Sequence, residues 1–412
     1  MKRPSLLLLT SSFPFGAGEE FLETEISYLA QRFDVTIAPL SQHLDFDKQR
    51  SLPAGVDVRP DILAMLPVGK KKTLQWLLRR PESAANVIQI LLHECLHVRC
   101  RPALLRALLR FITLGIRLSD VLGQFIGSQP VDIVYSYWLS AGAFAAGQLK
   151  KKGVARIAIS RAHRGDLYHE RSAIGYLPGQ APTLMHLDKI FCISEHGADY
   201  LRKRYPNHRH KIELSRLGVR PASVKNTPSQ DKRLHLVSCA YLSSVKRIDL
   251  VVNALAQCEI PVTWTHLGGG KLESEIRTAA EKLPHNIQWR ITGSVPNWKI
   301  LQFYQENPVD LFINVSASEG LPVSIMEAMS YSIPVAATDV GGNRELVSSG
   351  QGGILLPADI TPPFIARTLT DFYKLPSSQK QQMRQAAWQT WHDTVNAEVQ
   401  YPKFVHRLSV LI

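Results

Sequence analysis

Short apolar runs alternate with longer amphipathic stretches along almost the whole chain. The runs, which predict strands, cover residues 5–10, 35–39, 56–59, 131–136, 156–160, 189–194, 214–219, 234–240, 262–267, 286–291, 309–315, 333–337 and 352–356. Apolar runs of this kind are typical of parallel strands that are buried on both faces. The stretches between them suit helices, so the pattern predicts an α/β protein with doubly wound parallel sheets.

The alternation is interrupted once, by a polar segment at 221–232 that holds two prolines and has no periodic pattern. Such a segment is typical of a linker between domains. A chain of 412 residues also exceeds the usual size of one hydrophobic core. We therefore expect two Rossmann-like domains, at 1–220 and 233–376, followed by helices at 377–412.

The net charge of +13 is concentrated in two windows of the first predicted domain. Residues 70–118 hold ten basic residues against two acidic ones, and residues 150–220 hold fifteen against six. This excess predicts an anionic partner. No nucleic-acid recognition motif accompanies it, so we expect no nucleic acid and favour a phospholipid surface or a lipid-diphosphate acceptor. Five scattered cysteines suit a reducing cytoplasm, and no apolar run is long enough to span a membrane.

Residues 314–345 hold most of the candidate ligand-binding groups. A buried strand leads into a turn at Gly320, where no side chain blocks a ligand from the backbone, and Pro322 fits the first position of the next helix. The helix start offers unpaired N–H groups to an anion at Leu321, Val323 and Ser324. Glu319 and Glu327 add carboxylates that can accept hydrogen bonds from hydroxyl groups. The combination indicates a sugar nucleotide.

The same residues resemble a known family. The string E-G-L-P-V-S-I-M-E-A-M from Glu319, with P-V-A-A-T-D-V-G-G-N-R-E at 334–345, is similar to the donor-site signature of the family 4 retaining glycosyltransferases of GT-B fold. The resemblance implies two facing Rossmann-like domains with the active site between them and a last helix that crosses back to the first domain. It also implies attack by the acceptor hydroxyl on the front face of the sugar, with no metal and no obligatory covalent intermediate.

The resemblance implies a role for each matching residue. Glu319 would act catalytically by holding hydroxyls of the transferred sugar, and Glu327 would hold the ribose. The main chain would contact the donor at Gly320, Leu321, Pro322, Val323, Ser324 and, beside the nucleobase, Val295. Lys246 matches the lysine that neutralises the diphosphate. Tyr241 stands where the family usually has an arginine, so Arg247 is a candidate for the missing charge, unless Lys246 and Arg247 are merely a solvated basic pair.

The first predicted domain contributes two further elements. A loop with Gly16 and Gly18 follows the first strand, at the sheet edge where open α/β sheets bind ligands. By resemblance, this loop approaches the donor phosphates or the acceptor. His163, followed by Asp166, comes directly after a later strand and resembles the His…Asp element of exopolysaccharide-type members of the family. There the histidine approaches the transferred sugar and the reacting phosphate.

Three other patterns have simpler interpretations. His93 and His97 match the zinc-peptidase spacing, but no third ligand follows at the expected place, so chance is favoured. Asp45 and Asp47 stand in a polar loop without supporting context and are discounted as a metal pair. A long apolar helix from Pro102 is expected to be largely buried, the alternative being a helix that lies at a lipid interface.

Taken together, these features predict a hexosyltransferase-type enzyme that uses a UDP- or GDP-sugar and no cofactor or metal. The expected acceptor is a saccharide or lipid-linked saccharide, in bacterial surface or exopolysaccharide synthesis. The protein is expected in the cytoplasm, peripheral on the inner membrane. Two alternatives remain: a catalytically silent subunit that binds sugar nucleotides or polysaccharide, and a zinc peptidase that uses His93 and His97.

Overall fold

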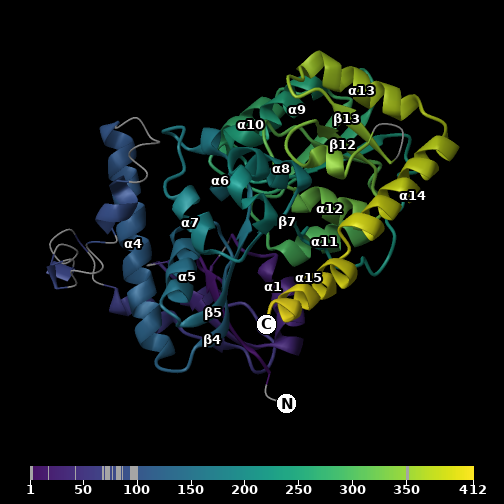
Figure 1. Ribbon diagram of the computed structural model, residues 1–412. Helices are drawn as coiled ribbons and strands as arrows, with labels where there is room; N and C mark the ends of the chain where they lie inside the picture. The colour runs from purple at the N-terminus through teal and green to yellow at the C-terminus, as the bar shows by residue number, and fades with distance from the viewer. Residues whose placement is uncertain are drawn as a thin grey trace. The chain divides into compact units, whose positions relative to one another are not determined.

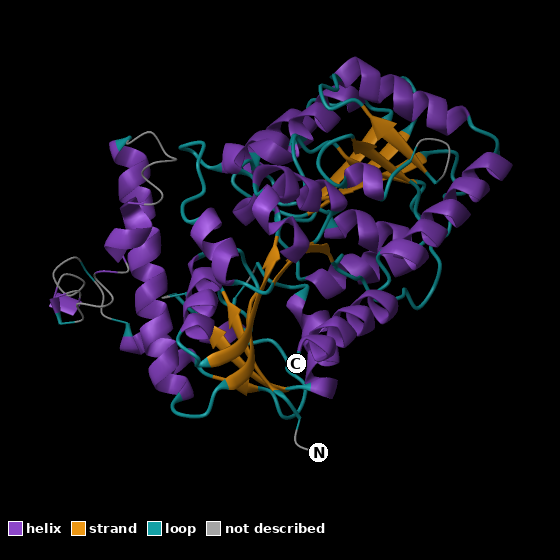
Figure 2. Cartoon of the chain, in the orientation of Figure 1, coloured by secondary structure: helices purple, strands orange, loops and turns teal. Residues whose placement is uncertain are grey.

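A computed structural model describes residues 3–16, 18–41, 43–66, 69, 75, 76, 78, 79, 85, 87–92, 101–348 and 352–412. The chain packs into two compact units (Figure 1). Unit 1 comprises residues 1–215 and 401–412, and unit 2 comprises residues 216–400. Each unit has a parallel sheet between helices (Figure 2), which confirms the predicted α/β class.

Unit 1 is built on a seven-stranded parallel sheet with the order β3-β2-β1-β4-β5-β6-β7. Its strands are β1 (Ser5–Thr10), β2 (Asp34–Pro39), β3 (Asp57–Val58), β4 (Val131–Ser136), β5 (Ala155–Ala162), β6 (Lys189–Cys192) and β7 (Ile212–Leu214). Its helices include α1 (Leu22–Arg32), α4 (Pro102–Ile126), α5 (Ala141–Lys151), α6 (Arg164–Leu167), α7 (Gln180–His186) and α8 (Glu195–Arg204).

Both faces of this sheet are buried, which explains its continuous apolar runs. Alternate residues of β1 pack into the hydrophobic clusters on the two faces of the sheet. Leu6 and Leu8 belong to one cluster, whereas Leu7 and Leu9 belong to the other. The cluster that contains Leu6 and Leu8 also contains Phe404 of α15 (Ala397–Leu411). The end of the last helix is therefore part of the unit 1 core.

Unit 2 has a six-stranded parallel sheet with the order β10-β9-β8-β11-β12-β13. Its strands are β8 (Leu234–Cys239), β9 (Val262–Leu267), β10 (Ile287–Ile291), β11 (Leu311–Asn314), β12 (Val335–Thr338) and β13 (Gly353–Leu356). Its helices are α9 (Ile248–Leu255), α10 (Glu273–Ala280), α11 (Asn297–Glu306), α12 (Val323–Ser330), α13 (Pro362–Lys374) and α14 (Ser377–Thr394).

The long helix α4 is buried mainly over its C-terminal half. A side chain at Gly115 would collide with Phe144 of α5, so these two helices pack closely. Arg117, in the same half of the helix, is buried too. Nearer the N-terminal end, Leu109 and Leu114 are exposed. Among the described residues, we find no helix long and apolar enough to cross a bilayer.

Candidate functional site

The strand order of unit 2 reverses between β8 and β11. At such a reversal the loops that follow the carboxyl ends of the two strands run to opposite faces of the sheet and leave room for a ligand. Here the two loops are joined by a hydrogen bond of 2.8 Å from the Ala317 N–H to the Val245 carbonyl. The predicted residues Lys246 and Glu319 lie on these loops, and the structure brings them together.

Lys246 Nζ lies 2.6 Å from Glu319 Oε1, and Glu319 is only 5% exposed. The loop that carries Glu319 is held by its neighbour after β12. The Gly342 N–H donates to the Gly320 carbonyl at 2.8 Å, and Gly341 has φ +55°. A Cβ at Gly341 would lie 2.0 Å from the Glu319 carbonyl oxygen, so only glycine permits this approach. The glycine pair therefore supports the position of Glu319.

The next helix, α12, begins at Val323, and Pro322 is its N-cap rather than its first helical residue. This is a correction by one position, because the Pro322 carbonyl already accepts hydrogen bonds from the Ile325 and Met326 N–H groups. Leu321, before the cap, is buried. Within the part of the chain that the structure describes, the N–H groups of Val323 and Ser324 have no hydrogen-bond partner. They are two of the three N–H groups that the sequence predicts as donors to an anion.

Glu327 lies one turn into α12 and is 6% exposed. Its Oε1 accepts a hydrogen bond of 2.7 Å from Asn297 Nδ2. Asn297 opens α11 directly after the loop with Val295, so Glu327 and this loop are neighbours, as the donor interpretation requires. Sequence reasoning missed Asn297, since an isolated asparagine at a helix start is an ordinary capping residue. Cys239 lies near both Glu327 and Lys246. Burial and the Glu327 carboxylate raise the pKa of its thiol, whereas the positive charge of Lys246 lowers this pKa.

Arg247 does not provide the second cation suggested by the sequence. It adopts a left-handed conformation with φ +50° between a short 3-10 turn at Ser244–Lys246 and α9, which begins at Ile248. Its guanidinium donates to three carbonyl oxygens: Val315 at 2.6 Å, Ser316 at 3.1 Å and Ala358 at 3.0 Å. Arg247 thus fixes the loop after β11 instead of facing a phosphate. Tyr241, in place of the family's arginine, is exposed.

A buried hydrogen-bond chain supports the loop after β8. Trp264 Nε1 donates to Ser238 Oγ at 3.0 Å, Ser238 pairs with His266 Nδ1 at 2.8 Å, and His266 Nε2 lies 3.1 Å from the Ala240 carbonyl oxygen. Because a carbonyl oxygen can only accept, Nε2 carries the hydrogen and Nδ1 accepts from Ser238. The histidine is therefore neutral and anchors the chain next to Tyr241. Gly268 packs closely on the same Ala240 carbonyl.

In unit 1 the strand order reverses between β1 and β4. A buried carboxylate, Glu19, joins the two loops at this point. It accepts hydrogen bonds from the N–H groups of Ser11 and Ser12 at 2.8 Å and of Phe13 at 2.7 Å, and from Trp138 Nε1 at 2.6 Å. Charge-assisted bonds of this kind are strong, so Glu19 fixes the loop after β1. The sequence signalled it only as an acid before the first helix.

The predicted glycines of this loop adopt positive φ, +77° at Gly16 and +111° at Gly18. Their N–H groups are engaged within the unit. Gly16 donates to the Lys48 carbonyl at 3.3 Å, and Gly18 donates to Glu20 Oε1 at 2.9 Å. Arg50 Nε and Nη2 both donate to the Gly16 carbonyl oxygen. The glycines thus shape the loop, and their N–H groups are not free to bind a phosphate.

His163 follows β5 and is 5% exposed. The Asp166 carboxylate accepts from the His163 N–H at 2.6 Å and from the Leu139 N–H at 2.7 Å, so it joins the loops after β4 and β5. The imidazole packs against Trp138 and Tyr137, with ring centroids 4.4 and 4.7 Å apart. Its Nε2 has no hydrogen-bond partner among the described residues. The His163 ring is therefore held in place by its aromatic neighbours with a buried Nε2 that has no partner among the described residues, and Asp166 supports the backbone around it.

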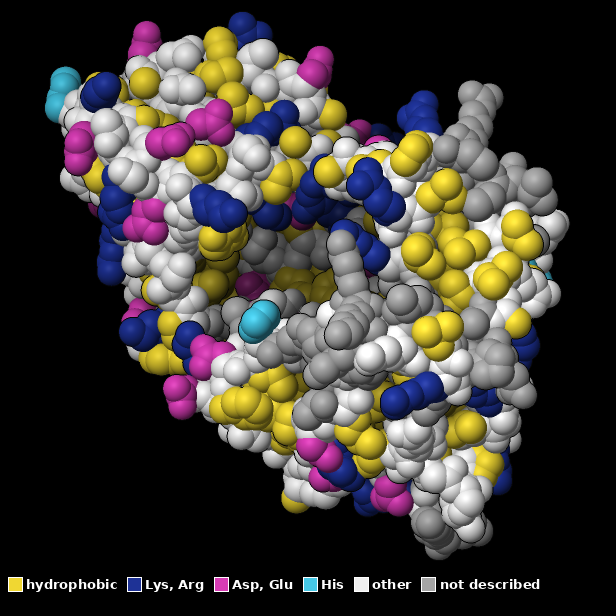
Figure 3. Space-filling view, turned by 90° about the vertical axis from the view of Figure 1, so that its left-hand side faces the viewer, with side chains coloured by type: hydrophobic (Ala, Val, Ile, Leu, Met, Phe, Trp, Pro, Cys, Tyr) yellow, Lys and Arg dark blue, Asp and Glu magenta, His cyan; other side chains and the backbone are white. Residues whose placement is uncertain are grey.

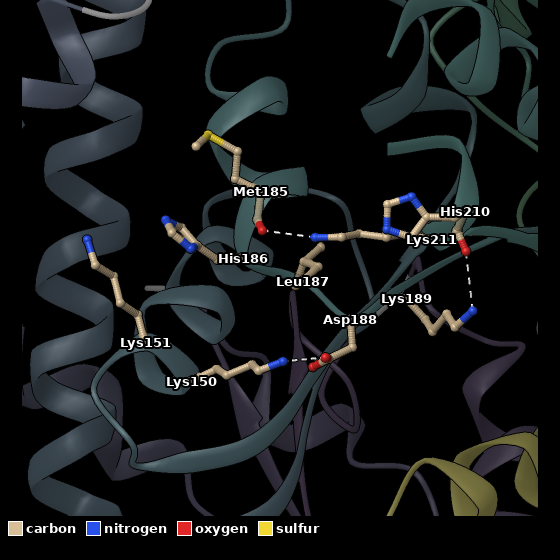
Figure 4. Close-up of a pocket in the computed structure, with 9 residues that line it drawn as sticks. All are labelled: Lys150, Lys151, Met185, His186, Leu187, Asp188, Lys189, His210 and Lys211. Atoms are coloured by element: carbon tan, nitrogen blue, oxygen red, sulfur yellow. Dashed lines mark hydrogen bonds and ion pairs between the residues drawn. The ribbon is translucent and has the colours of Figure 1, made fainter. Parts of the chain in front are cut away.

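The basic window 150–220 forms a pocket of about 420 Å³ at the opposite edge of the unit 1 sheet, where β6 and β7 begin (Figure 4). Three of the pocket's four lysines have local partners, Lys151 being the fourth. Lys150 pairs with Asp188, Lys189 pairs with Glu213, and Lys211 donates to two carbonyl oxygens at the end of α7. The formal charge of this window therefore overstates what its surface offers to an anion.

The zinc-peptidase pattern of His93 and His97 lies outside the described residues. Asp45 and Asp47 are described; Asp45 forms an ion pair with Lys48 at 2.8 Å, and both acids lie around a short 3-10 turn. Among the described residues, no three His, Cys, Asp or Glu side chains are grouped so that they could hold a metal ion.

Solved structures similar to this chain share its fold over nearly their whole length. HepE from Anabaena, crystallised with UDP, has a TM-score of 0.67 and 14% identity, and covers 99% of this chain and 100% of its own. Sucrose-phosphate synthase from Thermosynechococcus elongatus has a TM-score of 0.70 and 14% identity, with 99% of each chain covered. At such identities the likeness shows the fold alone, which is that of the GT-B glycosyltransferases.

Among curated proteins, the chain is similar to the putative colanic acid biosynthesis glycosyltransferase WcaL of Escherichia coli. The two are 28% identical over 277 residues, which cover 64% of this chain and 66% of WcaL. The amylovoran biosynthesis glycosyltransferase AmsK of Erwinia amylovora is 25% identical over 226 residues, covering 47% and 56%. The chain thus matches less than two thirds of the length of these relatives.

The family model described as "Glycosyl transferases group 1" matches residues 219–390. That range contains both loops at the strand reversal of unit 2, the start of α12 and Glu327. Over residues 219–390, which are less than half of its length, the chain is therefore similar to the glycosyl transferases group 1 family.

Proposed function

We propose that this protein is a retaining glycosyltransferase that moves a sugar from a nucleotide-diphosphate sugar to a saccharide acceptor in exopolysaccharide synthesis. The observation that carries the proposal is the set of groups around the strand reversal of unit 2. A paired Lys246 and Glu319, a helix start with available N–H groups and the buried Glu327 all lie on neighbouring loops. The similarity to WcaL and AmsK, whose names give them roles in colanic acid and amylovoran biosynthesis, supports the pathway class.

Each group has a task in this reaction. The diphosphate would rest on the N–H groups of Val323 and Ser324, where the helix dipole favours negative charge. Lys246 would add a cation for the leaving phosphate, so that no metal is needed. Glu327 would accept hydrogen bonds from the ribose hydroxyls, and Glu319 would do the same for the sugar. His163 of unit 1 would act on the transferred sugar or the reacting phosphate through its Nε2, which has no hydrogen-bond partner among the described residues.

The proposal is tested by turnover. Purified protein is incubated with a panel of UDP- and GDP-sugars and saccharide acceptors, with and without EDTA, and the anomeric proton of the product is followed by NMR. We expect one donor to react with retained anomeric configuration, to an equal extent in EDTA. An inverted product, or complete loss of turnover in EDTA, would contradict the mechanism.

A second candidate, a silent subunit that binds a sugar nucleotide without transferring the sugar, is favoured by one observation. The position where the family usually has an arginine is an exposed tyrosine, Tyr241, and Arg247 is engaged by carbonyl oxygens. The diphosphate site thus has one cation fewer than the family pattern. Donor binding without turnover of any acceptor would identify this case, and Tyr241→Arg would then be expected to strengthen donor binding.

We further propose a lipid-linked acceptor and peripheral attachment to the cytoplasmic face of the inner membrane through α4. Exposed Leu109 and Leu114 flank the exposed Arg106 and Arg110 on this helix. Figure 3, which views the side on which α4 lies, shows hydrophobic side chains in groups among lysines and arginines. Arginine beside leucine on one helix face suits an anionic lipid interface.

The test of this attachment is co-sedimentation of the protein with phosphatidylglycerol vesicles at low salt. Arg106→Gln with Arg110→Gln should lose the binding and Arg367→Gln, an exposed control in unit 2, should keep it; wild type that ignores the vesicles would refute the attachment.

A further inference from the structure

The outer side of α14 in unit 2 has an unusual composition. It presents five glutamines and a tryptophan, at positions 379, 381, 382, 385, 388 and 389. The amides of Gln381, Gln382 and Gln385 are exposed and have no hydrogen-bond partner among the described residues. Glutamine is a good helix former, so exposed glutamines alone would indicate only a solvated helix. The shape of the surface around them points further.

Two hollows meet on this side of α14. One, of about 950 Å³, lies between the helix and the start of β13, and the other, of about 380 Å³, lies between the helix and residues 225–228. Gln385 and Gln389 line both, so the hollows form one continuous surface along the helix. Volumes of this size are typical of sites for small organic ligands.

The lining matches the chemistry of a carbohydrate. Amide groups both donate and accept, as vicinal hydroxyls require, and Thr390 and Thr394 add hydroxyl groups in the larger hollow. Trp388 lines the smaller hollow; its orientation is fixed by Lys225 Nζ, 4.8 Å from the ring centroid, and by the stacked His392 ring at 5.1 Å. The indole stays partly exposed between these two neighbours, and its exposed part offers an apolar surface to the C–H groups of a sugar ring.

The charge along this surface is uneven. Lys225 and Arg384 line the smaller hollow, which has no acidic residue in its lining. Arg384 is 4% exposed, donates to the carbonyl oxygens of Val309 and Asn226 and to the Asn226 side chain, and has the Asp310 carboxylate nearby, so the accessible cation of this hollow is the exposed Lys225. This end of the surface therefore favours an acidic group.

We propose that the outer side of α14 binds an oligosaccharide chain, with an acidic sugar residue at the end formed by Lys225 and Trp388. The site goes beyond the proposed transfer reaction, because it shares no residue with the loops that carry Lys246, Glu319 and Glu327. It would hold a glycan chain on the enzyme independently of the donor.

The test is saturation-transfer NMR on the full chain with two probes, cellohexaose as a neutral glycan and a hyaluronan hexasaccharide as an acidic one. We expect transfer to both probes, stronger for the acidic one. Trp388→Ala should weaken binding of both by about tenfold, the usual effect of losing a stacked aromatic contact. Lys225→Gln should weaken only the acidic probe.

Phe364→Ala is the matched control, because Phe364 is an exposed aromatic on α13 outside both hollows and its removal should leave glycan binding unchanged. Binding of the nucleotide-sugar donor should be the same in Trp388→Ala as in wild type. The proposal is overturned if wild type shows no transfer to either probe at millimolar concentration. It is equally overturned if Trp388→Ala binds both probes as tightly as Phe364→Ala does.

Discussion

The buried histidine of unit 2 makes the stability of this unit depend on pH. His266 is held neutral, with Nδ1 accepting from Ser238 and Nε2 donating to the Ala240 carbonyl oxygen. Burial lowers the pKa of His266 to about 4, against an ordinary value of 6.5. The unfolded chain therefore binds a proton at a higher pH than the folded one. The contribution to stability is complete above pH 6.5 and is lost as the pH falls toward 4.

The size of the effect follows from the two pKa values. They differ by about 2.5 pH units, and each unit corresponds to about 1.4 kcal/mol, so the loss between pH 7 and pH 4 is about 3 kcal/mol. Below pH 4 both states bind the proton, and no further loss from this group is expected. The effect is large compared with the net stability of a typical domain, which is roughly 5–15 kcal/mol.

His266→Gln isolates this contribution. The glutamine carbonyl can accept from Ser238 and its amide can donate to Ala240, so both hydrogen bonds are retained while the titrating group is removed. The assay is urea unfolding at a series of pH values, with the variant subtracted from wild type so that other titrating groups cancel. Wild type should lose about 3 kcal/mol more than the variant between pH 7 and pH 4. Parallel profiles, or a wild type that gains stability relative to the variant as the pH falls, would refute the neutral buried histidine.

Three further substitutions test the supports of the two loop clusters. Glu19→Gln replaces a carboxylate that accepts hydrogen bonds from three backbone N–H groups and from Trp138 Nε1, and should destabilise unit 1 by about 2–3 kcal/mol in urea unfolding. An unchanged unfolding midpoint would show that these hydrogen bonds do not stabilise the loop. Arg247→Lys cannot reach three carbonyl oxygens at once and should cost about 1–3 kcal/mol in thermal unfolding, whereas a phosphate-facing arginine would tolerate the change with little loss of stability. Gly341→Ala places a Cβ against the Glu319 carbonyl oxygen at φ +55° and should lower the free energy of unfolding by more than about 1 kcal/mol. The same variant should bind the donor more weakly in calorimetry, and full donor affinity would contradict this expectation.

The sheets could be predicted closely because both faces of each are buried. β1, β4 and β9 begin and end at the predicted residues, and the other strands except β7 differ from their predicted bounds by one or two residues. The exception is β7, predicted at 214–219 but observed at Ile212–Leu214. Leu217 is buried outside the sheet, and Val219 pairs with the chain at Val395 and Asn396. An apolar run records burial but not the kind of structure that buries it.

The residues of the candidate site also differ in how far the sequence predicts them. Lys246, Glu319 and Glu327 were found because they belong to a motif with a fixed spacing. Asn297 and Glu19 were missed or undervalued because their partners lie on loops that only the folded sheet brings together. Arg247 was misassigned because its left-handed backbone, which turns the side chain toward three carbonyl oxygens, has no signal in a basic pair of residues.

The central claim is that unit 2 binds a nucleotide-diphosphate sugar with Glu327 on the ribose. The most direct test is saturation-transfer NMR of the purified protein against UDP- and GDP-sugars, with Glu327→Ala as the site variant and Glu281→Ala, an exposed glutamate after α10, as the matched control. The account predicts that one donor binds wild type and Glu281→Ala and is lost in Glu327→Ala. A donor that binds all three proteins equally, or no donor binding to wild type at millimolar concentration, would contradict it.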